Sequence, residues 1–458
     1  MGARLRDPRT ALAVALLAGA TLRLARVGTW PLMHPDGPAY LGLADAVLQG
    51  QWGKVLGSFY SPLYPIMIAP LRAAGLPIEL AGRLMATIAG VVALPVLFVI
   101  ARRLAGDAVA AATVLVAAVQ PALVKASAQV LPETLAGALL LAWAAVLMDA
   151  RGVGAVALAG VLGGSVYLAR PEGVILLVIG AGWLAVRRRP LATIAIYVLA
   201  AILTMAPAML ALHDRTGTWQ ISRREAKVNL EAGAVDDVTL ADSLRHHPTA
   251  LVRYWGVGIV EQTWDTVVAL GVVLALPFAV GLWTLPLAWP LAVAALFVAG
   301  PLALNPSPRY AVSILPLLLP WAGAGMLALA DRLGRRAAAV VALATVTLAV
   351  QGVWPTKQFD EQCSRDVRDL LLSRYGPDQS LVAKDGRFAY VAQGKAIVPK
   401  TTQPQEALTM ARERGAHLWL TRPQWLGKAF VVPPDVHEVA RPCAGVFILY
   451  EIDRTKTQ

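Results

Sequence analysis

Apolar segments long enough to cross a membrane recur through most of this 458-residue chain. Hydrophobic residues make up 57% of the sequence and charged residues only 15%, whereas a soluble domain is about 25% charged. A bilayer accepts such segments as helices, because each backbone N–H and C=O group then pairs within its own segment. The sequence therefore predicts a polytopic α-helical membrane protein with about eleven transmembrane helices.

The first apolar run follows a basic N-terminus and resembles a signal peptide. Arg23 and Arg26 at its end, and the lack of a convincing small-x-small cleavage site, favour a retained helix that starts in the cytoplasm. The expected spans are residues 11–25, 78–100, 108–124, 132–148, 153–168, 173–186, 191–212, 262–284, 287–304, 310–330 and 337–354.

The basic residues between these spans predict the orientation of the chain. With a cytoplasmic N-terminus, the cytoplasmic loops contain Arg102, Arg103, Arg151, the run Arg187, Arg188 and Arg189, and three Arg within 331–336. This is the positive-inside pattern, and a miscount by one helix would destroy it. We therefore expect a multi-pass protein of the cytoplasmic (inner) membrane. Loops 29–77, 125–131, 169–172, 213–261 and 305–309 and the C-terminal part would lie outside the cytoplasm.

The composition changes at residue 355, where charged residues become frequent and apolar runs shorten. Residues 380–383, 396–399, 417–420 and 445–452 have the pattern of strands, and residues 366–375 and 405–414 that of helices. We therefore expect two domains: a transmembrane domain of residues 1–354 and a small extracytoplasmic α/β domain of residues 355–458 with its own core.

The net charge of +12 would suggest a nucleic-acid partner in a soluble protein. Here the basic residues fit membrane topology and do not form an aromatic-lined stripe, so membrane lipids rather than nucleic acid are expected as partners. Cys363 and Cys443 both lie in the domain expected to face an oxidising compartment. A disulfide between them and two unpaired buried thiols both remain open.

Polar residues of chemical interest collect on the expected outer side. Ionisable groups at membrane borders cost free energy and often mark function. One acid among several cations suits a phosphate-linked substrate, because Arg and Lys bind phosphate through charge-assisted hydrogen bonds and the acid can deprotonate an acceptor. Asp36 is the candidate catalytic residue. The candidate substrate-binding residues are Lys54, Tyr60, Tyr64, Lys125, Glu133, Arg170, Glu172, Arg309 and Tyr310.

Structural roles compete with each of these assignments. Asp36 stands before Pro38, so it fits a helix N-cap as well as a catalytic acid. Arg170 and Arg309 suit helix ends at the lipid headgroups, and Glu133 suits a helix N-terminus.

Histidines in the long loop raise the question of a metal site. His213 and the adjacent pair His246 and His247 lack further ligand spacing. We therefore expect no cofactor, since ligand spacing does not support a divalent metal. Lys125 alone fits a solvated loop residue.

Four motifs, in this order, resemble the GT-C superfamily of membrane glycosyltransferases. They are HPDGPAYLGLADAVLQG, SPLYPIMIAP, LARPEG and RYAVSILPLLLP. The resemblance is strongest to the branch of bacterial aminoarabinose transferases and protein O-mannosyltransferases. It implies inverting transfer of a sugar from a polyprenyl-phosphate donor to a lipid, glycan or protein acceptor on the outer face of the membrane. It also implies that Asp36 is the general base and that cations neutralise the departing polyprenyl phosphate.

The chain departs from that branch at two positions. The branch often has Asp-Glu where this chain has Asp36-Gly37, and often a Lys where it has Ser61. Lys54, Arg170 and Arg309 are then unranked candidates for the phosphate cation. A transporter or flippase of lipid-linked sugars would predict inverted repeats and mid-membrane charges, of which the sequence shows little. A non-catalytic envelope assembly protein is the remaining alternative.

Overall fold

The computed structural model describes residues 7–29, 33–225, 228–229, 239–286, 308–353, 359–399, 402–427 and 430–453. Contacts divide these residues into two units. The first contains residues up to Thr29 and from Tyr40 onward to the end of the last long apolar helix, and the second contains residues 33–39 together with 359–453. The sequence placed residues 33–39 with the membrane domain, so their grouping with the C-terminal residues is a difference.

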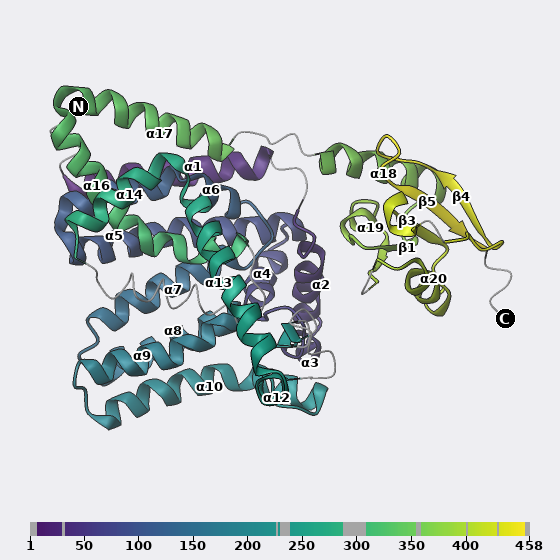
Figure 1. Cartoon of the computed structure of the whole chain (residues 1–458), viewed down its shortest axis with the longest axis horizontal. Helices are drawn as coiled ribbons and strands as arrows, with labels where there is room; N and C mark the ends of the chain where they lie inside the picture. Colours follow the sequence, from purple (N-terminus) through teal and green to yellow (C-terminus); the bar gives the residue numbers. More distant parts are fainter. Residues whose placement is uncertain are drawn as a thin grey trace. The chain divides into compact units, whose positions relative to one another are not determined.

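The first unit is built from helices (Figure 1). Its elements, with α2 starting in the segment 33–39, are α1 Pro8–Thr29, α2 Gly37–Leu48, α3 Trp52–Leu56, α4 Leu63–Ala73, α5 Ile78–Val119, α6 Pro121–Ala126, α7 Glu133–Met148, α8 Val153–Ala169, η2 Pro171–Val174, α9 Ile175–Val186, α10 Leu191–Thr216, α12 Leu240–His246, α13 Pro248–Leu270, α14 Val272–Thr284, η4 Pro308–Tyr310, α16 Ala311–Leu333, η5 Gly334–Arg336 and α17 Ala337–Val353.

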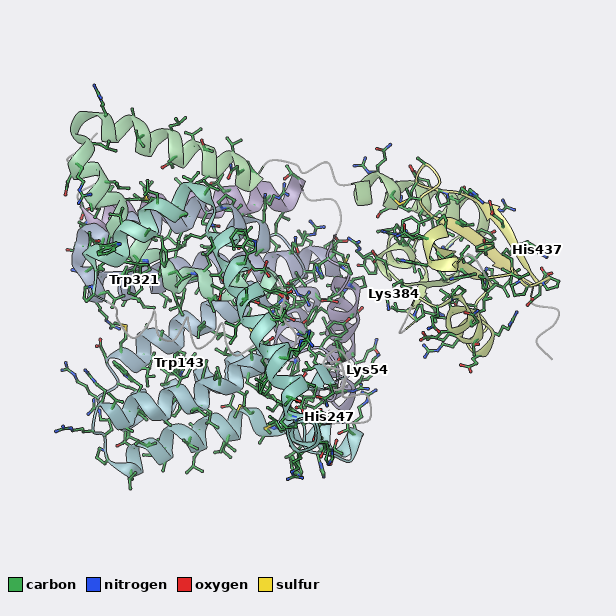
Figure 2. All side chains as sticks on the ribbon, in the orientation of Figure 1. Lys54, Trp143, His247, Trp321, Lys384 and His437 are labelled. Atoms are coloured by element: carbon green, nitrogen blue, oxygen red, sulfur yellow. A yellow bond between two sulfur atoms is a disulfide. The ribbon has the colours of Figure 1, made fainter. Side chains whose placement is uncertain are left out.

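Apolar faces of these helices pack against each other. Helix α1 packs on α5, α8 packs on α7 and α10, and α14 packs on α16 (Figure 1). Trp143 of α7 is fully buried (Figure 2). Its Nε1 donates to the Tyr197 hydroxyl at 3.1 Å, and that hydroxyl donates to the Leu176 carbonyl at 2.5 Å. The buried polar groups of Trp143 and Tyr197 thus have partners, as an apolar interior requires.

The described helices confirm a mostly helical chain with several apolar helices, but not a count of about eleven spans. Within the described ranges, four helices are long and apolar enough to cross a membrane: α1, α5, α10 and α16. The pair α13 and α14 makes a fifth if it is one span bent by 106°. Shorter apolar helices are α7, α8, η2 with α9, and Leu343–Val353. The expected span 287–304 lies outside the described residues.

Two glycines with positive φ mark breaks in the long apolar helices, one between two expected spans and one inside an expected span. Gly106, at φ 82° and ψ −176°, breaks α5 between the expected spans 78–100 and 108–124. The single expected helix 262–284 is wrong, because Gly271 at φ 81° ends α13 and starts α14. Positive φ is open to glycine without strain. Helix α13 also begins at Pro248, inside the expected long loop 213–261.

The second unit contains a five-stranded mixed sheet in the order β2-β1-β3-β5-β4 (Figure 1). Strand β1 runs parallel to β2 and β3, and β5 runs antiparallel to β3 and β4. Its elements are α18 Phe359–Tyr375, β1 Ser380–Ala383, α19 Arg387–Val391, β2 Lys395–Ile397, α20 Pro404–Glu413, β3 Leu418–Thr421, α21 Pro423–Leu426, β4 Val436–Ala440 and β5 Ile448–Ile452.

Alternating side chains of the sheet fill two cores. Leu381 and Leu418 face one core with α18 and α19, whereas Val382 and Trp419 face the other with α20. This alternation is the two-residue period of a strand. The sequence missed β4, whose VHEVA segment carries exposed polar residues on an edge.

A disulfide joins Cys363 of α18 to Cys443, with the Cα atoms 4.6 Å apart and a sequence separation of 80. Cys443, Ala444 and Gly445 all have positive φ, so the chain turns there. This turn explains why β5 begins at Ile448 and not at the expected Gly445. Loop closure on this scale stabilises a fold by about 4 kcal/mol.

Candidate functional site

A group of buried and half-buried polar side chains, most of them charged, lies in the first unit, with each member at or near a helix end. We call it the Glu133 cluster; its members are Glu133, Arg170, Glu172, Arg224, Arg309 and Tyr310. Glu133 is the first residue of α7, Arg170 follows α8, and Glu172 lies in η2. Arg309 and Tyr310 form the short η4 helix before α16. Helix ends thus bring residues from distant parts of the sequence together.

Arg170 is held by two carboxylates. Its Nη1 donates to Glu133 Oε1 at 2.7 Å, while Nε and Nη2 donate to the two Glu172 oxygens at 3.3 and 3.0 Å. The guanidinium also lies 3.8 Å from the centre of the Tyr310 ring. The side chains of Arg170, Glu133 and Glu172 are at most 3% exposed. A buried cation with this many partners is paired within the protein and offers no free face to a ligand.

Arg224 and Arg309 are held less completely by carboxylates. Arg309 Nε lies 3.5 Å from Glu133 Oε1, and its side chain is 25% exposed. Arg224 Nη1 donates to the Tyr310 hydroxyl at 3.2 Å. Burial opposes the charge on Arg224, but Tyr310, Tyr40 and Glu172 raise its pKa above the ordinary value.

The cluster has more positive than negative charge. Its named members include three arginines and two glutamates, which leaves a net charge of one positive unit. Glu133 Oε2 has no hydrogen-bond partner in the part of the chain that the structure describes. An anion is the ligand that this charge balance favours.

Three tyrosines form an aromatic group in the same unit. The ring of Tyr40 makes edge contacts with Tyr60 and Tyr64, with ring centres 5.1 and 5.5 Å apart. The Tyr64 hydroxyl donates to the Gly82 carbonyl at 2.8 Å, and Tyr64 is fully buried. Tyr64 therefore packs the core, while Tyr60 is half-buried. Sequence reasoning missed Tyr40, although it stands in the same HPDGPAY motif as Asp36.

Neither candidate lysine forms a hydrogen bond or ion pair with the cluster among the described residues. Lys54 is exposed on α3 (Figure 2). Lys125 is half-buried in α6, where burial and the charge of Arg26 lower its pKa. Arg224, in contrast, belongs to the cluster, although from the sequence it was only one of several charged residues of the long loop and not a candidate substrate-binding residue. The run Arg223-Arg224-Glu225 in the long loop was the available signal.

Asp36 lies in the second unit, directly before the first residue of α2. Its backbone N–H donates to His34 Nδ1 at 3.2 Å, and the same Nδ1 is 3.6 Å from Asp36 Oδ2. The Asp36 side chain is 23% exposed. It is thus a carboxylate open to solvent at the start of a helix.

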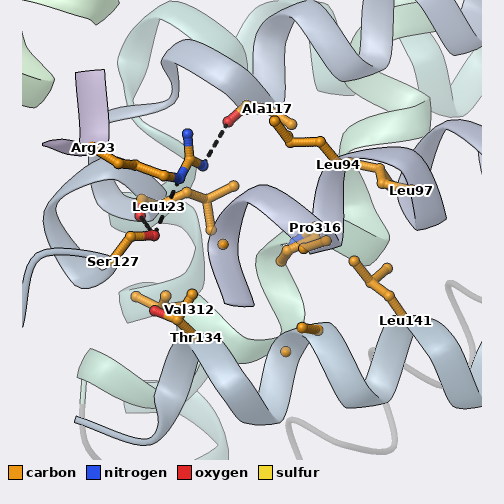
Figure 3. A pocket seen from close by; sticks show the side chains of 14 residues that line it. Arg23, Leu94, Leu97, Ala117, Leu123, Ser127, Thr134, Leu141, Val312 and Pro316 are labelled. Atoms are coloured by element: carbon orange, nitrogen blue, oxygen red, sulfur yellow. Dashed lines mark hydrogen bonds between the residues drawn. The ribbon is translucent and has the colours of Figure 1, made fainter. Parts of the chain in front are cut away.

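A further buried cation, Arg23 of α1, lies beside an apolar cavity (Figure 3). It donates to Ser127 Oγ at 3.2 Å and to the carbonyl oxygens of Gly19, Ala118 and Ala117 at 3.1, 3.0 and 3.4 Å. Ala117 and Ala118 belong to the last turn of α5. A cation at the C-terminal end of a helix interacts favourably with the helix dipole, so Arg23 has a structural role.

Over the described ranges, no group of three or more His, Cys, Asp or Glu side chains could hold a metal ion. Nor does any protein-family model match the sequence, and no curated protein matches it significantly.

Solved structures are similar along most of the chain. ArnT from Cupriavidus metallidurans, bound to undecaprenyl phosphate, has a TM-score of 0.57 at 16% identity, covering 97% of this chain and 98% of ArnT. The archaeal oligosaccharyltransferase AglB from Archaeoglobus fulgidus, in complex with an inhibitory peptide and a dolichol-phosphate, has a TM-score of 0.51 at 12% identity. That match covers 91% of this chain and 69% of AglB.

The chain has the GT-C fold. The resemblance inferred from the four sequence motifs is therefore confirmed at the level of the fold. At these identities the GT-C likeness concerns the fold, and the reaction has to be argued from the site.

Proposed function

We propose that this protein transfers a sugar, with inversion, from a polyprenyl-phosphate carrier to a lipid, glycan or protein acceptor on the outer face of the membrane. The excess positive charge of the buried Glu133 cluster is the observation that carries the proposal. The GT-C fold supports it, since the similar ArnT and AglB structures hold undecaprenyl phosphate and dolichol-phosphate.

Arg309 and Arg224 are the proposed phosphate ligands. Arg170 is paired with Glu133 and Glu172, so we assign it the positioning of those carboxylates. Arg309 is partly exposed, and Arg224 has the Tyr310 hydroxyl, not a carboxylate, as its hydrogen-bond partner. These two guanidiniums can neutralise the negative charge that develops on a departing phosphate.

Asp36 is the proposed general base. It takes the proton of the acceptor hydroxyl or amine as the acceptor oxygen or nitrogen attacks the anomeric carbon. The bond from that carbon to the phosphate oxygen breaks, and the polyprenyl phosphate leaves with the electron pair. Asp36 stands four residues before Tyr40, so chain connectivity alone keeps their Cα atoms within about 14 Å.

The proposed orientation has two supports. Basic residues concentrate in the loops assigned to the cytoplasm, which is the positive-inside pattern. The disulfide between Cys363 and Cys443 fits a C-terminal unit in an oxidising compartment.

The test is transfer by the reconstituted full-length protein from a pool of polyprenyl-phosphate sugars. Asp36→Asn should lower the rate by about 100-fold or more, the typical contribution of general base catalysis. Asp45→Asn is the matched control, because Asp45 is an acid of α2, the helix that follows Asp36, and its side chain is 46% exposed.

Normal transfer by folded Asp36→Asn would refute the assignment of the base. A wild-type protein that moves lipid-linked sugars between leaflets without transferring them would be a transporter instead.

A further inference from the structure

The segment that carries Asp36 makes its contacts with the C-terminal unit. Residues 33–39 group with residues 359–453, whereas α2 from Tyr40 onward groups with the helices. The Nη1 atom of Arg387 donates to the carbonyl oxygen of Met33 at 3.4 Å. This hydrogen bond joins positions 354 residues apart. It places an arginine of the small α/β unit on the backbone three residues before Asp36.

Met33 is fixed on its other side as well. Its side chain is only 3% exposed and lies against Gly37, where an added Cβ would come within 2.7 Å of Met33 Sδ. Gly37 is the first residue of α2 and the neighbour of Asp36. The Met33 side chain therefore packs on the first turn of the helix, next to Asp36.

Arg387 is itself held rigidly. Its Nε lies 2.9 Å from each oxygen of Asp385, and its Nη2 donates to Asp385 Oδ2 at 2.5 Å. Asp385 Oδ1 also accepts the backbone N–H of Arg387 at 3.0 Å. A two-oxygen carboxylate partner fixes the plane of a guanidinium, so the remaining Nη1 points in a defined direction.

The support continues into the sheet. Asp385 follows β1, the strand that lies between β2 and β3. Lys384, labelled in Figure 2, donates from Nζ to the Pro399 carbonyl at 3.2 Å and so connects the chain beyond β1 to the chain beyond β2. Leu381 and Val382 of β1 are fully buried. The end of a well-packed strand is a rigid support for a side chain that positions another residue.

We propose that Arg387 is a positioning residue, through which the C-terminal unit holds the segment 33–36 and so orients Asp36. This inference rests on the proposed function, because it assumes that Asp36 is the base. A general base must stand within hydrogen-bond reach of the proton it removes, and a displacement of about 1 Å can lower a rate by about 100-fold. The small α/β unit is then part of the catalytic apparatus without contributing a reacting group.

The experiment compares four full-length proteins: wild type, Arg387→Gln, Arg387→Lys and the control Arg441→Gln. Arg441 forms a comparable two-bond pair with Glu438 in the same unit, at 2.7 and 3.0 Å. Three quantities are measured on each: the steady-state kcat, the donor KM, and the amide hydrogen exchange of peptides covering residues 33–48.

Arg387→Gln should lower kcat by about 10- to 100-fold with little change in donor KM, and it should speed exchange at residues 33–40. Arg387→Lys should recover part of kcat, because an ammonium can still donate to the Met33 carbonyl. Arg441→Gln should leave kcat, donor KM and hydrogen exchange unchanged. If Arg387→Gln does not fold, Asp385→Asn takes its place, since it removes charge from the partner that orients Arg387.

Unchanged exchange in Arg387→Gln would show that the hydrogen bond to Met33 does not restrain residues 33–40. Faster exchange with unchanged kcat would refute the positioning role of Arg387. If wild type transfers no sugar while Arg387→Gln still speeds exchange, the proposed function fails and the structural restraint stands.

Discussion

Arg170 and Glu133 form a salt bridge with 2.7 Å between Nη1 and Oε1, and both side chains are only 3% exposed. Arg170 also pairs with Glu172. Removal of Arg170 leaves buried Glu172 without its salt-bridge partner and leaves Glu133 only the longer contact to Arg309, at 3.5 Å. Removal of Glu133 leaves Arg170 still paired with Glu172. We therefore expect Arg170→Gln to lower the free energy of unfolding by about 3–5 kcal/mol, and Glu133→Gln to lower it by less.

The measurement is the unfolding midpoint in mixed detergent micelles, followed by fluorescence. Arg187→Gln is the control, because Arg187 is exposed just after α9. If Arg170→Gln unfolds at the midpoint of Arg187→Gln, or if Glu133→Gln proves the less stable variant, this account of the cluster is wrong.

Arg309 is expected to contribute to donor binding. A charge-assisted hydrogen bond contributes about 1.5–3 kcal/mol, so Arg309→Gln should lower kcat/KM for the donor by about 10- to 100-fold. Inhibition by a short polyprenyl monophosphate should weaken by a similar factor, since that molecule carries the same anionic group. Arg332→Gln is the control, because Arg332 is exposed at the other end of the following helix α16. Equal inhibition of Arg309→Gln and Arg332→Gln would show that Arg309 does not bind the phosphate.

The close packing of helix α14 against helix α16 should depend on two glycines at the point where the helices cross. A Cβ at Gly281 would overlap the Trp321 carbonyl, and a Cβ at Gly325 would overlap that of Pro277. Gly281→Ala or Gly325→Ala should therefore destabilise the protein, by about 1–3 kcal/mol. Gly182→Ala on α9 has no atom within 4 Å of the added carbon, so it should be neutral or slightly stabilising. Thermal unfolding in detergent ranks the variants, and equal midpoints for Gly182→Ala and Gly281→Ala would contradict this packing.

Local patterns predicted most of the helices and strands. Strand β1 at Ser380–Ala383 and helix α7 at Glu133–Met148 match their expected ranges within a residue, because apolar period and flanking residues decide such elements. The 106° bend between α13 and α14 was not predicted, because a glycine inside an apolar run does not reveal whether it adopts positive φ.

The site was harder to predict than the fold. The sequence selected Glu133 from an expected outer turn and Arg170, Glu172, Arg309 and Tyr310 from two of the motifs. The structure brings these five residues together. Which cation is paired with which carboxylate depends on tertiary packing, so Lys54, Arg170 and Arg309 could not be ranked. The contact from Arg387 to Met33 spans 354 positions, and no local pattern in a single sequence encodes such a pairing.

Arg23 should stabilise the membrane unit although no carboxylate is among its recorded partners. It donates to the carbonyls of Ala117 and Ala118 at the end of α5 and to Ser127. Arg23→Met keeps much of the side-chain volume but leaves these buried acceptors without their donor, which should cost about 1–3 kcal/mol. Arg9→Met is the control, because Arg9 is exposed in the first turn of the same helix. The unfolding midpoint in detergent should fall for Arg23→Met and not for Arg9→Met. Equal midpoints of the two variants would mean that the hydrogen bonds from Arg23 to the carbonyls at the end of α5 do not stabilise the protein.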